Sequence, residues 1–427
     1  MILFPEAMNR ILLGCVFAFV CSIGYCGDGA IVAHVDKVQD SYVVKLYDSF
    51  VGSADAVADQ YHASHGGVKK QVWHGAFEGF SMDMTAAAAA AVSSDARVEN
   101  VEEDALATPS DWSCPQEHAR CADGWIPWQL DRIDQYNLPL NVKYWRNGQQ
   151  QGSGIDIYVI DDGISASNYE FTSARGAGVI RVLPGVDFAG DGLGTNVSCS
   201  FHGTAVASAA IGRTVGVARD AKVIPVRVSK CNSSPSESNL ISAFNWIIDN
   251  HWGTTAIANL SITMPTSSNI DRAATSLIND GVLLVAAAGN AGGDACNSSP
   301  GRVAGVLTVA ASTKTDTRAS FSNGGTCVAL FAPGQAVGLA RVQGDVDCNP
   351  GNNGTSFAAP LVAGAAAVFL NAGGYRYSPA QLRTLLINEA NPVMKLSTSD
   401  TSPNRLLSVS VFGDCGLLYT PPTPPAQ

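Results

Sequence analysis

The stretch Asn353-Gly-Thr-Ser-Phe-Ala-Ala-Pro-Leu-Val-Ala-Gly364 decides the fold, because the segment that leaves it, residues 357–370, is apolar almost all round. A helix with apolar side chains on every face is buried inside a large domain. Gly354 and Thr355 turn the chain into this helix, so we expect Ser356 at its N-terminal end, where the helix dipole favours developing negative charge. Pro360 is expected in the first turn, where a missing N–H costs little. Most Gly-Thr-Ser turns only cap a helix, so the stretch alone does not define a function.

Short apolar runs alternate with helical segments upstream of this helix. The runs are residues 155–160, 223–228, 257–262, 282–288 and 306–311. The helical segments are residues 204–211, 239–250 and 271–279. This alternation predicts an α/β domain, a doubly wound and mostly parallel sheet with both faces covered. Active sites of such sheets gather at the carboxyl ends of the strands.

Polar residues follow two of these runs and open one helix. Asp161 comes directly after the first run, Asn290 after the fourth, and His202 begins a helix of small residues. Each has a simpler interpretation, because Asp-Asp-Gly and Gly-Asn are common turns and a lone histidine often caps a helix. Their joint occurrence before Ser356 is different. Nucleophilic acyl transfer needs a serine, a base that deprotonates it, a carboxylate that orients the base, and donors for an oxyanion.

These residues resemble the subtilisin-like serine proteases, in particular the secreted proteinase K and aqualysin branch, and their chain order Asp, His, Ser is that of subtilisin. The resemblance runs from about Trp128 to Leu407. The matching stretches are Tyr158-Val-Ile-Asp-Asp-Gly163, His202-Gly-Thr204, Ala287-Ala-Gly-Asn290, Ala319-Ser-Phe-Ser-Asn323, Phe331-Ala-Pro-Gly334 and Gly354-Thr-Ser-Phe-Ala358.

The resemblance implies a serine endopeptidase that hydrolyses peptide bonds through an acyl-enzyme. Ser356 is then the nucleophile, His202 the general base and acid, and Asp161 the carboxylate that orients the imidazole. The Asn290 amide and the Ser356 backbone N–H form the oxyanion hole. No metal or other cofactor takes part in the chemistry.

Three departures from the branch lie near this set. Asp162 replaces the usual Thr or Ser, as in the kexin branch, and Ala205 and Leu361 replace histidines that are not catalytic. The complete triad argues against an inactive relative.

The resemblance also implies that substrate lies as an extended strand between two enzyme segments that are rich in glycine in the family. Here they read Ser233-Ser-Pro235 and Ser261-Ile-Thr-Met264. Pro235 has no N–H to donate, Thr263 is expected to crowd the pocket for the residue before the cleaved bond, and Met264 to cover neighbouring subsites. The substrate-binding residues are expected to be Ser233, Ser234, Pro235, Ser261, Ile262, Thr263, Met264, Ala287, Ala288 and Gly289.

The 427 residues divide into five predicted parts. Residues 1–27 form a signal peptide, since Arg10 precedes an apolar run too short to span a bilayer. Residues 28–106 form a small α+β unit that resembles the family's ferredoxin-like propeptide, which acts as chaperone and inhibitor. Residues 107–127 are a processing boundary, residues 128–412 the subtilisin-like peptidase domain, and residues 413–427 a proline-rich tail.

Within the propeptide, strands are expected at residues 41–47 and 98–101, with one or two strands in 68–84. Helices are expected at 54–65 and 85–92. The last strand is expected to end before the acidic run Glu102-Glu-Asp104. The chain is then a zymogen that cuts itself between Ala107 and Gly124.

Composition and charge bound the partners. The net charge of −11 argues against nucleic acid. The expected partners are protein or peptide substrates and the chain's own propeptide, for a secreted monomer with no membrane contact after signal removal.

The chain has 11 cysteines. Three, Cys15, Cys21 and Cys26, lie in or beside the signal, which leaves eight and predicts disulfides in an oxidising compartment. By resemblance and position we expect Cys199–Cys231 and Cys296–Cys327. Cys114, Cys121, Cys348 and Cys415 leave three pairings open.

Calcium is the one structural ion that the resemblance raises. In proteinase K-like enzymes two carbonyls and one aspartate hold it just before the Phe-x-Pro-Gly turn. Ala329 stands at the aspartate's place, so we expect no tight calcium there.

A second function class stays open on the sequence: a catalytically silent binding or decoy protein on the same fold, or an inhibitor acting through its propeptide. An esterase on an α/β-hydrolase fold is disfavoured, because the chain lacks a Gly-x-Ser-x-Gly elbow.

Overall fold

A computed structural model describes residues 31–75, 77–109, 125–144, 151–172, 179–197, 201–231, 233–252, 255–342 and 346–410. The predicted signal peptide and the C-terminal tail lie outside these residues, as does most of the processing boundary.

A parallel sheet of seven strands forms the centre of the larger domain, in the order β14-β13-β11-β9-β6-β8-β7. The strands are β6 (Asp156–Asp161), β7 (Val186–Asp187), β8 (Lys222–Arg227), β9 (Ala256–Leu260), β11 (Val282–Ala287), β13 (Leu307–Ser312) and β14 (Leu330–Pro333). Side chains of β9, β11 and β13 are buried along their whole length, as expected for strands covered on both faces. The predicted α/β class is confirmed.

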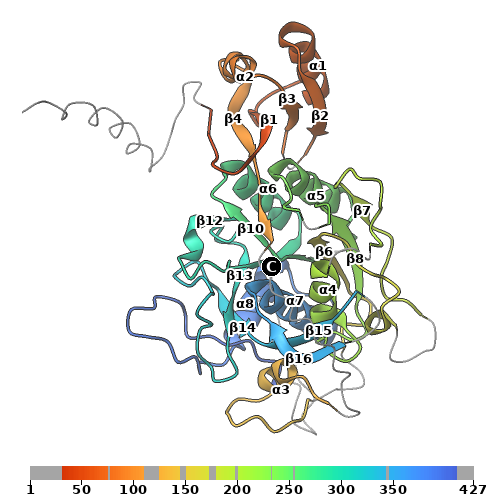
Figure 1. Ribbon diagram of the computed structural model, residues 1–427, viewed down its shortest axis with the longest axis vertical. Coiled ribbons are helices and arrows are strands. Elements are labelled where there is room, and N and C mark those ends of the chain that lie inside the picture. Colours follow the sequence, from red (N-terminus) through yellow and green to blue (C-terminus); the bar gives the residue numbers. More distant parts are fainter. Residues whose placement is uncertain are drawn as a thin grey trace, which may run out of the picture.

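Helices cover both faces of this sheet (Figure 1). On one face α4 (His202–Ile211) and α7 (Thr355–Ala372) share an apolar core with residues of α3 (Trp128–Ile133) and α8 (Pro379–Asn388). On the other face α5 (Glu237–Asn250) and α6 (Ser268–Asn279) share a second core with the outward side of the same strands. A hairpin of β15 (Val337–Ala340) and β16 (Val346–Asn352) lies against α4.

Helix α7 is the central helix that the apolar stretch predicts. By length and composition it is apolar enough to cross a membrane, but 89% of it is buried inside the protein. Ser356 is its second residue. Our placement of Pro360 in the first turn was wrong, because Pro360 is the sixth helical residue.

The absence of an N–H at Pro360 has a local consequence. In a regular helix this N–H would bond the carbonyl of Ser356, four residues earlier. The Ser356 carbonyl instead accepts a hydrogen bond from Ser261 Oγ at 2.7 Å. Pro360 therefore leaves the carbonyl of Ser356 available to a side chain from β9's end, which ties the helix start to the sheet.

A smaller domain stands on the larger one at the top of Figure 1. Its antiparallel sheet has the order β2-β3-β1-β4, with β1 (Lys37–Leu46), β2 (Val68–Trp73), β3 (Gly79–Asp83) and β4 (Val98–Ala105). Helices α1 (Ala54–His65) and α2 (Ala86–Ser93) pack on one side, in the predicted ferredoxin-like order β-α-β-β-α-β.

Strand β4 runs four residues further than predicted, through the acidic run to Ala105. The expectation that Glu102 and Asp104 end the strand was wrong, because hydrogen-bond donors in the larger domain satisfy both carboxylates. Glu102 accepts hydrogen bonds from Ser267 Oγ and Ser268 Oγ at the start of α6. Asp104 accepts two from Ser238, at 3.0 Å from the backbone N–H and 2.7 Å from the hydroxyl. Helix N-termini stabilise such carboxylates, so the acidic run docks one domain on the other.

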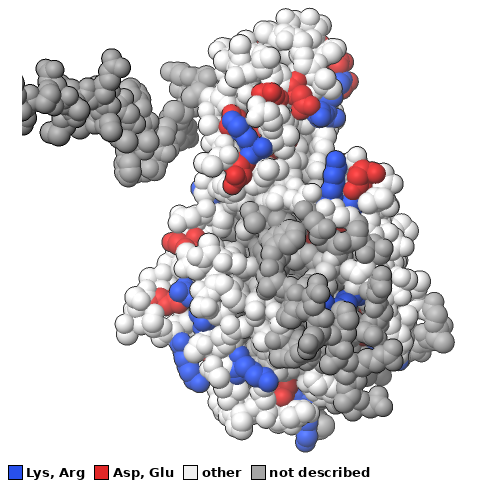
Figure 2. Space-filling view, in the orientation of Figure 1, with Lys and Arg blue, Asp and Glu red and all other residues white. Residues whose placement is uncertain are grey.

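The sheet of the smaller domain covers α5 and α6. Trp73 Nε1 donates to Ser242 Oγ at 2.8 Å, and Val43, Trp73 and Phe77 join the apolar core of α5. Figure 2 shows basic and acidic side chains interspersed over the described part of this face.

Candidate active site

The carboxylate and the imidazole meet at the carboxyl edge of the sheet. Asp161 is the last residue of β6 and His202 the first of α4. The distance between His202 Nδ1 and Asp161 Oδ1 is 2.8 Å, and both side chains are at least nine-tenths buried. Asp161 Oδ1 also accepts from the backbone N–H of Asp162 at 2.9 Å. A carboxylate on Nδ1 places the reactive ring nitrogen, Nε2, on the opposite side of the imidazole.

Asp162 supports this pair from the backbone side. Its Oδ1 accepts a hydrogen bond from the Gly203 N–H at 2.9 Å, in the first turn of α4. The charge therefore lies at a helix N-terminus, where it is favourable. The departure from Thr or Ser has a structural role, since it fixes the start of the helix that carries His202.

The serine lies at the start of α7, fully buried. Its Oγ donates to the Ser261 carbonyl at 2.9 Å, and Ser261 Oγ donates to the Ser356 carbonyl. The next residue, Phe357, packs against the ring of His202 with centroids 5.8 Å apart. These contacts link the start of α7 to the start of α4 through Phe357, and to the end of β9 through Ser261.

Asn290 is oriented by a residue that the sequence did not single out for function. Its Oδ1 accepts from Thr355 N at 2.9 Å and from Thr355 Oγ1 at 2.8 Å. Thr355 Oγ1 in turn accepts from the Gly289 N–H at 3.1 Å. Because the oxygen end of the amide is held on Thr355, the NH₂ end is turned away from α7's first residue. The Gly-Thr-Ser motif was the available signal, but Thr355 within it was interpreted only as part of a turn.

The two segments predicted to bind substrate, residues 233–235 and 261–264, lie on either side of a strand of this chain. Segment β5 (Thr108–Pro109) pairs antiparallel with β10 (Ile262–Pro265), with Thr108 opposite Thr263 and Pro109 opposite Ile262. On the other side the Ala107 N–H donates to the Pro235 carbonyl at 2.8 Å. Pro235 lacks a donor, but its carbonyl still bonds an extended chain. An extended chain therefore lies between the two edges, as peptides do when they add a strand.

Residues 287–289, at the end of β11, form the wall that lies opposite β10. Gly289 has φ +100°, and a Cβ atom there would lie 2.5 Å from Asn323 Nδ2 and 3.6 Å from Thr263 Cγ2. The Thr263 methyl group thus approaches the 287–289 wall. Asn323 fixes this wall, donating to the Ala288 carbonyl at 2.9 Å and accepting from Gly293 N at 2.9 Å. Asn323 lies in one of the matching stretches, but the sequence analysis assigned it no function.

The remaining predicted residues lie along the same edges. Ser233 and Ser234 are exposed before α5, while Ser261, Ile262, Met264, Ala287 and Ala288 are buried. Met264 packs in the cluster that holds Ala105 and Ala107 of the extended segment.

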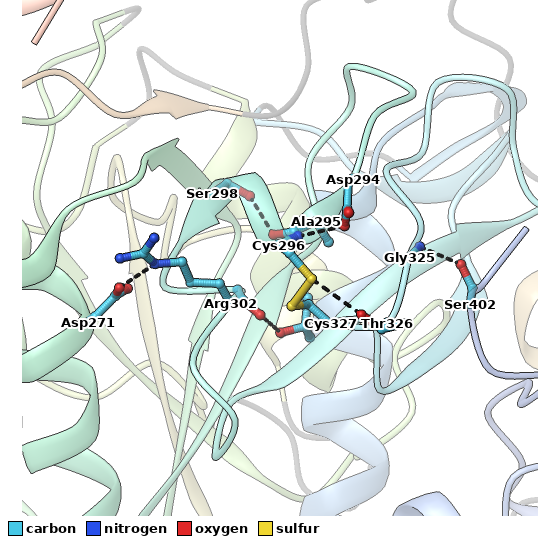
Figure 3. The surroundings of a disulfide bond; sticks show 12 residues. Asp271, Asp294, Ala295, Cys296, Ser298, Arg302, Gly325, Thr326, Cys327 and Ser402 are labelled. Carbon is cyan, nitrogen blue, oxygen red and sulfur yellow. Dashed lines mark hydrogen bonds and ion pairs between the residues drawn. A yellow bond between two sulfur atoms is a disulfide. The ribbon is translucent and has the colours of Figure 1, made fainter. Parts of the chain in front are cut away.

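The predicted Cys296–Cys327 disulfide is confirmed, and it spans 31 residues. It joins the loop after β11 to the loop before β14, where the Asp294 side chain caps the turn at Cys296 (Figure 3). Cys231 is also disulfide-bonded. Its expected partner, Cys199, lies outside the described residues, as do Cys114, Cys121 and Cys415 and the side chain of Cys348.

Ala329 offers no calcium ligand from its side chain. Its methyl group is buried in the core and its N–H donates to the Thr308 carbonyl at 2.8 Å. The position does not fit the carboxylate-assisted calcium site of the proteinase K type.

The fold and site define a class: a parallel α/β domain of subtilisin-like fold, entered by the last strand of a ferredoxin-like domain. The profile of the Subtilase family matches residues 152–413, and that of the Peptidase inhibitor I9 matches residues 31–108. The chain therefore belongs to the subtilase family.

Similar proteins agree with this assignment. An "Extracellular serine proteinase" of Thermus sp. (strain Rt41A) is 42% identical over 66% of this chain and 65% of its own length. "Alkaline serine exoprotease A" of Vibrio alginolyticus is 37% identical over 76% of this chain and 57% of its own. This chain thus spans less than two thirds of both relatives. A crystal structure of "a cold adapted subtilisin-like serine proteinase" matches with TM-score 0.60 and 39% identity, over 66% of this chain and 98% of the other.

Proposed function

We propose that the chain is a secreted serine endopeptidase made as a zymogen that processes itself. The observation that carries the proposal is the hydrogen bond between Asp161 and His202, together with the pairing of residues 108–109 with β10, the strand that follows Ser261. Family membership and the relatives named as a serine proteinase and an exoprotease support the same activity.

The chemistry follows from the roles of these groups. His202 Nε2 takes the proton of Ser356 as Oγ attacks the peptide carbonyl, and the Asp161 carboxylate stabilises the imidazolium that forms. The oxyanion receives hydrogen bonds from the Asn290 NH₂ and the Ser356 N–H, and the imidazolium then protonates the leaving amine. Water, deprotonated by the same imidazole, hydrolyses the acyl-enzyme and regenerates Ser356. No metal or cofactor is needed for these steps.

The register of the paired strand points to the bond that is cut during maturation. Thr108 faces Thr263 and Pro109 faces Ile262. The described pairing ends at Pro109, and Ser110 is the next residue in the sequence, as Ser261 is the residue before Ile262. The Ser261 carbonyl is hydrogen-bonded to Ser356 Oγ. We therefore propose cleavage between Ser110 and Asp111, inside the boundary of residues 107–127, with residues 28–110 remaining as an inhibitor and residues 413–427 as a tail.

The position of Thr263 supports a preference for small residues before the cleaved bond. The Thr263 methyl group approaches the wall at Gly289, and the residue that maturation would place there is a serine. We further propose that residues 1–27 direct export and that the protein acts as a monomer without membrane contact. We also propose that no calcium binds tightly at Ala329.

N-terminal sequencing of the purified product tests it. The wild-type chain is expected to yield a mature form that begins at or near Asp111. Ser356→Ala, expressed without other proteases, should remain uncut. Maturation of the alanine variant would overturn the proposal, and an uncut wild-type chain would favour the silent binding protein.

A further inference from the structure

A group of buried metal-ligating side chains lies where the two domains meet, away from the catalytic edge. It consists of His34 and Glu102 of the smaller domain and Glu237 of the larger one. Their ligand atoms, one from each residue, all lie within 4.8 Å of one another. We propose that these three side chains bind a divalent transition-metal cation, with zinc as the best match, and that the ion fastens the propeptide to the peptidase domain.

The three side chains come from different segments, which the fold brings together. Residue 32 runs parallel to β4, with Val32 N donating to the Val101 carbonyl at 3.0 Å, and this places His34 beside Glu102. Glu237 is the first residue of α5, and the next residue, Ser238, donates hydrogen bonds to Asp104 of β4. Neither domain alone holds all three ligands.

Two atoms aimed into the cluster have no hydrogen-bond partner among the described residues: His34 Nε2 and Glu237 Oε2. The His34 side chain is 5% exposed, and Glu237 is fully buried. His34 Nε2 lies 3.6 Å from Glu102 Oε2, which is too long for a hydrogen bond. Buried polar atoms without partners are rare, so these two atoms call for a ligand.

The charge of the cluster also favours a cation. Glu102 and Glu237 face each other, and no lysine or arginine pairs with either of them within the described ranges. A divalent ion would neutralise the buried Glu237 carboxylate, and it would share the Glu102 carboxylate with Ser267 and Ser268.

The donor set selects the kind of ion. Imidazole nitrogen with two carboxylates suits zinc, whereas calcium and magnesium prefer all-oxygen sites. Ligands of a tetrahedral zinc lie roughly 3.4 Å apart, from zinc–ligand distances of about 2.1 Å. The 3.6 Å between His34 and Glu102 is close to this, and small side-chain movements would close the rest. Asn269 Nδ2 donates to Glu237 Oε1 at 3.1 Å, which would orient the ligand from behind.

The full chain carrying Ser356→Ala is the protein for the test, because it keeps both domains joined. After dialysis against a chelator it is loaded with zinc, desalted, and assayed for zinc per chain and for Tm. Cobalt(II) loading adds a spectroscopic signature, because tetrahedral Co(II) absorbs strongly in the visible region. We expect one tightly held zinc, a Tm higher by a few degrees, and a cobalt spectrum of tetrahedral type.

His34→Ala and Glu237→Gln should each lose all three properties. Glu237→Gln keeps the shape and the Asn269 contact, so it reports on the ligand and not on folding. His74→Ala, which removes an exposed histidine of the same domain, is the matched control and should retain them. Zinc that persists in His34→Ala, binding at the catalytic histidine, or no stoichiometric zinc in the parent would overturn the site.

Control of propeptide release is the part of this inference that rests on the proposed function. In the wild-type chain a zinc-selective chelator should then shorten the lag before activity appears. A wild-type chain that never cuts itself would refute the protease assignment, whereas failed zinc binding in Ser356→Ala would refute only the metal site.

Discussion

Replacing Thr355 by valine isolates the residue that positions Asn290. Thr355→Val keeps the shape and the backbone N–H on Asn290 Oδ1 but removes the Oγ1 donor at 2.8 Å. Losing one of two such bonds costs about 0.5–1.5 kcal/mol, against roughly 2.7–4 kcal/mol for losing an oxyanion donor outright. We therefore expect kcat to fall about 2- to 13-fold, and KM to change little, because the role proposed for the Asn290 amide is at the transition state.

The same substitution leaves the Gly289 N–H without its acceptor. An orphaned buried donor costs about 1–3 kcal/mol, so Tm should fall by several degrees. The assay is steady-state hydrolysis of a chromogenic peptide, with Thr355→Ser as the conservative control that restores the hydroxyl. Thr275→Val, on the exposed side of α6, controls for the loss of a threonine hydroxyl elsewhere. An unchanged kcat in Thr355→Val, or equal impairment in Thr355→Ser, would refute the positioning role.

Three further predictions concern the segment at residues 261–264, the disulfide, and Asp104 on strand β4. Thr263→Gly with Met264→Gly should raise kcat/KM for Phe or Tyr before the cleaved bond relative to Ala, and a wild-type enzyme that already cleaves after Phe as readily as after Ala would contradict the crowding argument. Cys296→Ser with Cys327→Ser opens a closure of 31 residues and should cost about 3–4 kcal/mol of unfolding free energy, which denaturant titration measures; an unchanged midpoint would show that the loops are held by other contacts. Asp104→Ala removes both bonds to Ser238 and should shorten the lag before activity, while an unchanged lag would mean that the acidic run does not hold the propeptide.

The sequence predicted the features that depend on pattern and order. Continuous apolar runs define the buried strands, and the apolar stretch after Ser356 defines α7, because burial on both faces leaves little choice of side chain. The sequence failed where partners come from distant segments. Glu102 and Asp104 continue β4 because serines at the starts of α5 and α6 donate hydrogen bonds to their carboxylates. Nothing within the sequence of the smaller domain indicates those partners.

The candidate site divides in the same way. Asp161, His202, Ser356 and Asn290 are recognisable by motif, since their chemistry fixes the residue type. The positioning role of Thr355 depends on a three-dimensional contact with Asn290, and its backbone turn gives no sign of it. The position of Pro360 in the helix was predicted wrongly. Proline is accepted in the second turn because Ser261 Oγ, which follows β9, donates to the Ser356 carbonyl that Pro360 leaves without a donor.

The central claim is that Ser356 is a nucleophile activated by His202. Labelling the mature protein with a fluorophosphonate and mapping the modified peptide tests it most directly. The account predicts a single adduct on Ser356 that forms rapidly in the wild-type protein and is absent in Ser356→Ala. In His202→Ala its rate should fall by several orders of magnitude. An adduct on another serine, or labelling of Ser356 at the same rate without His202, would contradict it.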